Sequence, residues 1–431
     1  MADFNFKKWN LILGWLAFLI AFITYSLTVE PTVSFWDAGE YILTSSKLQV
    51  GHPPGAPFFQ MMGAFFSIFA SEPSQIGLMI NMMSTTASAF TILFMFWSIV
   101  LLIKQVAKYD NESSKDQNMA VLGAAFVGSL SFAFTDSFWF NAVETEVYAM
   151  ATLIMAVLFY LGLRWENEMF TPRGNKWLIL ISFVVGLSFG VHFMGLLTIP
   201  AISLIYFFKN YKTVTIKNFI LANIAGVAIL LFVFKLLAPN ILRYFSALEI
   251  FFVNSVGMPF NSGSIIAFIL LVGFIFWGLN YTRKKGYIHL NTGLLCITFI
   301  VIGFSSWLML PIRANANVTV NENNPSSARE LLAYYNLEQY PKTHLFYGPQ
   351  FTNQYVGLDE NQPYVDDKPK YEKDEVAEKY VIVNDYKDGL QNYNTEHASF
   401  LPRMWSDEHA ENYMMYSGFL EFSIKTEYQM Q

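Results

Sequence analysis

The chain has 431 residues, of which 54% are hydrophobic and only 14% are charged, and its net charge is −6. Soluble proteins carry about 25% charged residues, so this composition argues against an ordinary soluble enzyme and favours a polytopic membrane protein. The single Cys excludes an intrachain disulfide. The charge is uneven: residues 312–431 hold 19 acids and 10 bases, whereas residues 1–311 hold 14 acids and 17 bases.

Apolar runs predict the membrane-spanning helices. A spanning helix needs about 20 mostly apolar residues, and the first such run follows Lys7 and Lys8 without a small-residue cleavage site. We therefore interpret it as an uncleaved signal anchor. About nine spans are predicted in all: 9–28, 75–103, 119–135, 147–163, 177–191, 193–208, 218–237, 264–281 and 291–311.

The run 177–208 is too long for one ordinary span. Because Gly186, Gly190 and Gly195 lie near its middle and glycine commonly breaks helices, we divide it near His192. The alternative is one long kinked helix. Dividing the run keeps the later loops on the sides that their charges favour.

The distribution of basic residues predicts the orientation. With a cytoplasmic N-terminus, 14 Lys and Arg fall in inner segments and only Lys47 and Arg243 fall in short outer loops. The membrane domain is then 1–311, and the acidic segment 312–431 is extracytoplasmic. We expect this segment to be small and mixed α/β, with a helix at 327–340 and a strand at 379–386. Its end shows no clear stop signal, so we expect a chain that is the front part of a longer protein.

Groups able to do chemistry gather in the first outer loop, 29–74. The stretch SFWDAGEYILTSSKLQVGHPPGAPFF (34–59) places Asp37 and Glu40 three residues apart, so a helix would put both carboxylates on one face. A neighbouring carboxylate and partial burial raise a carboxyl pKa, which suits a general base. The alternative is that both are solvated loop charges.

The prolines after this acid pair predict a rigid turn. GHPPG cannot continue a helix, and the apolar segment 58–70 is too short to span. We therefore expect a turn at His52 and then a helix at the membrane surface. The order of acid pair, turn and surface helix suits a reaction at the outer membrane boundary, where one substrate is a lipid. The alternative for His52 is a polar turn residue.

The second outer loop, TDSFWFNAVETEVYA (135–149), holds three further candidates: Glu144, Glu146 and Tyr148. The two acids have either a substrate role or a structural hydrogen-bonding role, and the aromatic residues of this loop suit interfacial anchoring.

Two more polar residues stand next to apolar runs. His192 lies between glycines, where an ionisable residue is a candidate for donor or sugar binding or a hydrogen-bonded core residue. Arg313 directly follows the last span, where its guanidinium suits phosphate binding or interfacial snorkelling.

The order of these motifs resembles a known family. FWDAGEYI…LQVGHPPGAPFF, SFWFNAVETEVYAM (137–150), GLSFGVHFMGLLTIPA (186–201), PIRANANVTVNENNP (311–325) and FLPRMWS (400–406) are similar to segments of bacterial multispan proteins that were long of unknown function. That family is related to protein O-mannosyltransferases. The resemblance covers essentially the whole chain, and longer members of the family add to the expectation of a truncated chain.

The resemblance implies a C-type glycosyltransferase in the bacterial inner membrane. Such enzymes move a sugar from a polyprenyl phosphate to an acceptor protein or glycan outside the cytoplasm. By this resemblance Asp37 is the general base that deprotonates the acceptor hydroxyl, with inversion at the sugar, and Glu40 is its substitute or helper. His52, Glu144, Glu146, Tyr148, His192 and Arg313 are then the expected substrate-binding or donor-binding residues.

The sequence disfavours several other classes. It has no Walker or Rossmann glycine loop, no outer basic patch for nucleic acid, and no pair of ligands at metal-binding spacing. A divalent metal held by Asp37 with Glu144 or Glu146 stays open. Two alternative functions also stay open: a transporter or flippase of a lipid-linked saccharide, and a non-catalytic envelope assembly protein.

Overall fold

The computed structural model describes residues 4–109, 114–340, 344 and 346–416. The chain forms two compact units. Unit 1 comprises Met1–Leu248 and Ser264–Leu337, and unit 2 comprises Glu249–Gly263 and Glu338–Gln431. Residues 312–337 therefore group with the membrane helices.

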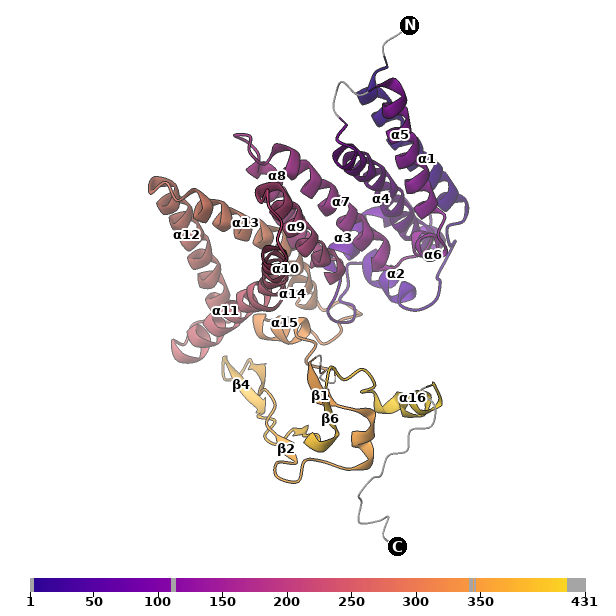
Figure 1. Ribbon diagram of the computed structural model, residues 1–431. Helices are drawn as coiled ribbons and strands as arrows, with labels where there is room; N and C mark the ends of the chain where they lie inside the picture. Colours follow the sequence, from indigo (N-terminus) through magenta and orange to yellow (C-terminus); the bar gives the residue numbers. More distant parts are fainter. Residues whose placement is uncertain (1–3, 110–113, 341–343, 345, 417–431) are drawn as a thin grey trace. The chain divides into compact units, whose positions relative to one another are not determined.

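Unit 1 is a helical bundle. Helix α4 packs on α1 and α7, and α8 packs on α13 and α7. Figure 1 shows α2, α6, α14 and α15 toward the end of this unit that lies away from the N-terminus. The helices are α1 (Phe6–Leu27), α2 (Ala38–Ser46), α3 (Pro57–Ser67), α4 (Ile76–Val106), α5 (Lys115–Ala133), α6 (Asp136–Ala142), α7 (Val147–Glu168), α8 (Asn175–Ser188), α9 (Thr198–Asn210), α10 (Ile216–Leu231), α11 (Ala238–Ile250), α12 (Ser262–Lys284), α13 (Ile288–Phe304), α14 (Met309–Ala314) and α15 (Ala328–Tyr335).

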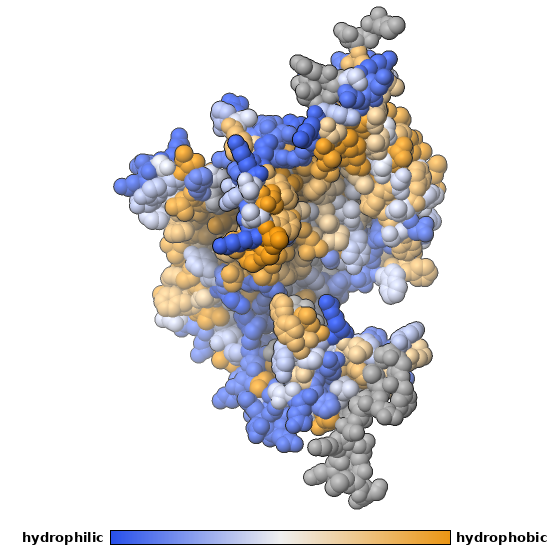
Figure 2. All heavy atoms as spheres, viewed as in Figure 1, coloured by the Kyte–Doolittle hydropathy of each residue, from blue (hydrophilic) through white to orange (hydrophobic). Residues whose placement is uncertain are grey.

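The long helices make this a polytopic membrane protein. Among the described residues, seven helical stretches are long and apolar enough to cross a membrane: Phe6–Leu27, Pro73–Val106, Val147–Glu168, Phe193–Asn210, Ile216–Ser255, Ser262–Lys284 and Ile288–Ala314. The bent pair α5 and α6 makes an eighth if it counts as one span. The predicted number of nine is not confirmed, because α8 has only 14 residues. Hydrophobic residues cover the sides of the helices on the face seen in Figure 2, and hydrophilic residues gather at helix ends near the N-terminus.

The predicted break near His192 is present and contains Gly190 and Gly195, whereas Gly186 acts differently from the expectation. Helix α8 ends at Ser188, His192 is extended, and a 3₁₀ turn (Phe193–Leu197) leads into α9. Gly186 lies inside α8, where an added Cβ would come within 2.2 Å of the Ile300 carbonyl oxygen on α13. This glycine therefore allows two helix backbones to approach closely and does not end a helix.

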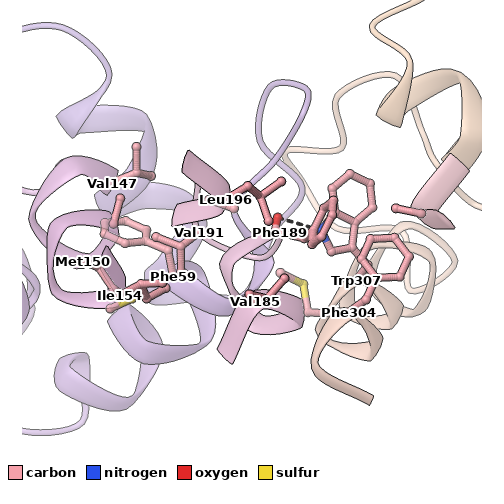
Figure 3. Packing of buried hydrophobic residues seen from close by; sticks show 14 of the residues in the cluster. Phe59, Val147, Met150, Ile154, Val185, Phe189, Val191, Leu196, Phe304 and Trp307 are labelled. Atoms are coloured by element: carbon pink, nitrogen blue, oxygen red, sulfur yellow. Dashed lines mark hydrogen bonds between the residues drawn. The ribbon is translucent and has the colours of Figure 1, made fainter. Parts of the chain in front are cut away.

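The main core of unit 1 joins the short helix α3 to the long helices. Phe59 of α3 is fully buried in a cluster with residues of α7, α8, α13 and the turn after His192. Figure 3 shows Trp307 beside Phe304, with its indole N–H donating to the carbonyl of Phe189 at 2.9 Å. Because burying a Phe side chain stabilises by about 1.5–3 kcal/mol, this cluster holds α3 in place against the bundle.

Unit 2 is small and contains short antiparallel strands. Strand β1 (Tyr347–Pro349) pairs with β6 (Ala398–Phe400), β2 (Tyr364–Val365) with β5 (Leu390–Gln391), and β3 (Lys370–Asp374) with β4 (Lys379–Asn384). It also contains the helix α16 (Ala410–Tyr416). The strand predicted at 379–386 is confirmed by β4, and the helix predicted at 327–340 is the shorter α15 of unit 1. A mostly helical membrane protein with a small strand-containing C-terminal segment is confirmed.

Candidate active site

One buried side chain of α4 anchors both loops of the site, 29–74 and 135–149. The side-chain amide of Asn81 donates to the carbonyls of Glu30 and Thr32, at 2.7 and 2.8 Å, and its oxygen accepts a hydrogen bond from the Thr145 hydroxyl. A buried amide needs such partners, so Asn81 fixes the two loops relative to each other. Sequence reasoning missed Asn81, although an Asn inside the apolar run 75–103 was a usable signal.

Asp37 lies at the start of α2 as an accessible carboxylate. The helix begins at Ala38, so Asp37 occupies the N-cap position, and its side chain makes no capping hydrogen bond. That side chain is 59% exposed. The preceding Trp36 is 87% exposed and has φ +59°, a left-handed conformation that a bulky residue adopts at a cost. The local backbone therefore presents Asp37 to solvent.

His52 lies between the two carboxylates that the sequence singled out. Its backbone N–H donates to Glu40 Oε1 at 2.7 Å, and its Nδ1 lies 2.9 Å from Glu40 Oε2. Its Nε2 lies 4.0 Å from Asp37 Oδ2. The turn after α2 thus brings three of the predicted residues together in the order Glu40, His52, Asp37.

Two glycines allow the His52 turn to fit. A Cβ on Gly51 would come within 2.6 Å of Glu40 Oε1. Gly55 has φ +75°, and a Cβ there would come within 2.8 Å of the Tyr334 hydroxyl. The Tyr334 hydroxyl also donates to the Gly51 carbonyl at 2.6 Å. Only a residue without a side chain leaves room for the Glu40 carboxylate at position 51.

Glu40 and His52 stabilise each other's charged forms. The hydrogen bond that the His52 side chain donates to Glu40 raises the pKa of His52, and the charges of Glu40, Asp37 and Glu322 raise it further, against the opposing effect of burial. Burial raises the pKa of Glu40, but the hydrogen bonds from His52 outweigh it and hold that pKa below its ordinary value.

Tyr41 is a buried member of the site that sequence reasoning missed. Its ring centroid lies 5.7 Å from that of His52 and 5.2 Å from that of Phe59. Burial raises the pKa of Tyr41, and the charges of Glu146, Asp37 and Glu40 raise it further. Its neutral hydroxyl therefore shares a neighbourhood with all three acids. The spacing of four residues after Asp37 was the available signal.

The loop 135–149 contributes two buried carboxylates. Glu146 is 6% exposed, and burial together with the charges of Asp37 and Glu144 raises its pKa to about 7. The backbone N–H groups of Val147 and Asp37 oppose this rise. Burial also raises the pKa of Glu144. Glu146 therefore belongs to the same electrostatic cluster as Asp37 and is half protonated near neutral pH.

Tyr148 and His192 form a neighbouring pair. Their ring centroids are 5.4 Å apart. The Nδ1 of His192 accepts a hydrogen bond from the backbone N–H of Met194 at 3.1 Å, so the neutral ring carries its proton on Nε2. Tyr148 is 45% exposed, which leaves its hydroxyl accessible beside the acid cluster.

Arg313 is bound to the backbone after α2. Its Nε donates to the carbonyl of Leu48 at 2.6 Å, and Nη2 donates to the carbonyl of Lys47 at 3.1 Å. Close by, residues 320–322 pair with Val50: the Val50 N–H donates to the Val320 carbonyl, and the Glu322 N–H donates to the Val50 carbonyl. The segment after the last span thus supports the turn that carries His52.

The predicted site residues fall into three groups. Asp37, Glu40 and His52 form a contiguous network, and Glu146 couples to it through charge and backbone. Tyr148 and His192 form a ring pair, whereas Arg313 contacts only backbone carbonyls in the hydrogen bonds found. Within the described part of the chain, no three His, Cys, Asp or Glu side chains are placed to hold a metal ion.

The fold and the site define a multi-pass membrane protein with an acidic site in the loops 29–74 and 135–149, and comparison with known proteins gives the family resemblance. Residues 37–215 match the family described as the protein O-mannosyl-transferase TMEM260 N-terminal domain. This region begins at Asp37 and includes Glu40, His52, Glu144, Glu146, Tyr148 and His192. Residues 341–429 match a family of unknown function, DUF8416.

Two curated relatives support the same resemblance. The chain is 27% identical over 197 residues to protein O-mannosyl-transferase tmem260 of Dictyostelium discoideum, which is 43% of this chain and 22% of the relative. It is 23% identical over 164 residues to the Mus musculus protein O-mannosyl-transferase TMEM260, which is 38% of this chain and 21% of the relative. The match thus spans about a fifth of the length of these relatives. No solved structure matches the chain. The resemblance to protein O-mannosyltransferases is confirmed.

Proposed function

We propose that this protein is a membrane glycosyltransferase that moves a mannose-like sugar from a polyprenyl phosphate to a hydroxyl of a secreted protein. The observation that carries the proposal is the exposed carboxylate of Asp37 at the start of α2, whose Oδ2 lies 4.0 Å from the Nε2 of His52 in the Glu40–His52 pair. It lies at the first residue of the region that matches O-mannosyltransferases. The proposed location of the reaction is the extracytoplasmic face of the membrane.

The proposed chemistry needs only one base. Asp37 removes the proton from the acceptor hydroxyl as that oxygen attacks the anomeric carbon, and a positioned base of this kind contributes about 10²–10⁴-fold to a rate. The lipid phosphate departs from the opposite face, so the configuration inverts. Unlike the leaving alcohol of a glycosidase substrate, a phosphate leaves without protonation. The half-protonated Glu146 and the hydroxyls of Tyr41 and Tyr148 are neighbours able to hydrogen-bond sugar hydroxyls.

An apolar cavity in unit 1 suits the lipid part of this donor. It has a volume of about 630 Å³ and lies between α7, α8, α9, α10 and α13, with Ala225, Val185 and Ile300 in its wall. An isoprenoid chain gains free energy when its apolar surface enters such a cavity. We propose that the chain of the donor occupies it.

The test is sugar transfer in membranes that contain or lack the full chain. We expect labelled mannose to move from polyprenyl-phosphate mannose to protein only in membranes with the chain, and no transfer when a nucleotide mannose replaces the lipid donor. Equal transfer in both membranes, or transfer from the nucleotide sugar in membranes unable to make the lipid donor, would contradict the proposal.

A further inference from the structure

The hydrogen bonds around His52 hold its ring in one orientation. Glu40 accepts from the backbone N–H of His52 through Oε1 and faces Nδ1 through Oε2. Because a charged carboxylate only accepts hydrogen bonds, it selects the tautomer with the proton on Nδ1. The nitrogen without a proton is then Nε2, the atom that faces Asp37 at 4.0 Å.

We propose that His52 is a positioning residue that takes through Nε2 the proton which Asp37 removes from the acceptor, while Glu40 keeps the ring in the accepting tautomer. This inference rests on the proposed function and goes beyond it by assigning the path of the proton.

The proton path balances over one turnover. The acceptor O–H bond breaks, its electron pair forms the new bond to the anomeric carbon, and the proton goes to Asp37. The bond from the anomeric carbon to the phosphate oxygen breaks, and its electron pair stays on the phosphate. Asp37 then passes the proton to Nε2 of His52, and the imidazolium releases it to water. Imidazole is a stronger base than carboxylate, so this step is downhill and restores Asp37.

The exposure of the two side chains fits this path. The Asp37 side chain is 59% exposed and makes no capping hydrogen bond, so it is free to close the gap of 4.0 Å to Nε2. Catalytic hydrogen bonds are often long in the absence of substrate. The His52 side chain is 27% exposed, which leaves a route for the proton to water.

The charges that face His52 favour a proton over a phosphate. Glu40 of α2 and Asp37, the residue before α2, both face His52. Glu322 faces His52 from the segment after the last span, and Tyr41 packs beside the His52 ring. Three acids around one imidazole stabilise the imidazolium and repel an anion. The same geometry therefore disfavours His52 as the donor phosphate ligand.

The test compares His52→Gln with His289→Gln in the full chain, because His289 is exposed in the first turn of α13, whereas Arg313, which contacts the turn that carries His52, follows the other end of that span. With polyprenyl-phosphate mannose as donor, we expect H52Q to lower kcat about 10–100-fold without changing the KM for donor, and H289Q to be unchanged. In His52→Ala, which leaves space beside Asp37, added imidazole restores part of the rate.

The pH profile separates a proton path from a packing role. Only neutral His52 accepts a proton, and its pKa lies above 6.5, so the wild-type rate rises with pH through a limb above 6.5. This limb disappears in H52Q. In Glu40→Gln it moves to lower pH, because the carboxylate that raises the pKa of His52 is gone. Glu146 titrates at about 7, so Glu146→Gln is the control and must keep the limb.

Four results would overturn the inference: wild-type kcat in H52Q, a raised donor KM at constant kcat, a limb that persists in H52Q, or a limb lost only in Glu146→Gln. Failure of imidazole to restore any rate in a folded His52→Ala protein would also overturn it. A wild-type chain that transfers no sugar contradicts the proposed function itself, whereas an active wild type with any of these results contradicts the inference alone.

Discussion

At the scale of single residues, Glu146 is the group whose protonation matters most near neutral pH. It is nearly fully buried, close to Asp37 and Glu144, and its pKa is about 7. A carboxyl with a raised pKa binds more protons in the folded state than in the unfolded state between about pH 4.5 and 7. The free energy of unfolding therefore falls as pH rises through this window, and the loss is complete above 7.

We expect Glu146→Gln to remove this loss. The neutral amide keeps the shape of the protonated side chain, so the variant should gain up to about 3 kcal/mol of stability relative to wild type at pH 8 and little at pH 5. The measurement is the thermal unfolding of the full chain in detergent at both pH values, with the exposed loop variant Glu72→Gln as control. An equal effect at pH 5 and pH 8 would contradict the raised pKa.

The sequence predicted part of this cluster and missed the rest. Asp37 and Glu40 were found because two acids stood alone beside an apolar run, and His52 because a His stood among prolines. Their mutual contact was not predictable, since it depends on a turn that returns His52 to α2. Tyr41 and Asn81 were missed although each left a weak signal, the spacing from Asp37 and the place inside an apolar run, because neither signal separates a site residue from a core residue.

At the scale of elements, the turn after α2 is held by segments distant in sequence. Arg313 at the end of the last span donates to the carbonyls of Lys47 and Leu48, and Val50 pairs with residues 320–322. Because Arg313 directly follows a span, the sequence suggested either phosphate binding or interfacial snorkelling for it. Backbone carbonyls are now found as its partners, and such long-range partners leave no local pattern.

We expect Arg313→Ala to act on the turn more than on the donor. Loss of hydrogen bonds from a charged donor costs about 1.5–3 kcal/mol each, so thermal stability and kcat should both fall while the KM for polyprenyl-phosphate mannose stays within about twofold of wild type. Unfolding and steady-state kinetics of the same preparation measure both effects. A large rise in donor KM at unchanged stability would instead assign Arg313 to the phosphate.

The apolar cavity beside α10 gives a second prediction at this scale. Ala225 lines the cavity and Ala228, one turn later, is exposed and outside its lining. We expect Ala225→Trp to raise the donor KM several-fold with little change in kcat, because the indole takes space needed by the isoprenoid chain, and Ala228→Trp to be unchanged. Unaltered KM in a folded Ala225→Trp protein would place the lipid chain elsewhere.

At the scale of the whole molecule, composition and apolar runs predicted the class of fold well. Within a bilayer, the backbone polar groups must be hydrogen-bonded inside the protein, which favours long apolar helices with few charges. The low charge and the long apolar segments of this sequence therefore predicted a polytopic helical protein. The number of spans was harder to predict from the sequence. Helix α8 is short and α5 bends sharply into α6, and both features depend on packing against neighbouring helices. The strands of unit 2 were mostly missed, since β1, β2, β5 and β6 have only two or three residues each and such strands carry almost no pattern.

The most direct measurement of the central claim is the turnover of polyprenyl-phosphate mannose by the full chain with Asp37→Asn, with donor binding measured separately. If the carboxylate at the start of α2 is the general base, kcat falls by about 10²–10⁴-fold while the affinity for donor, thermal stability and membrane insertion stay as in wild type. An Asp37→Asn protein that turns over donor at the wild-type rate would contradict the account.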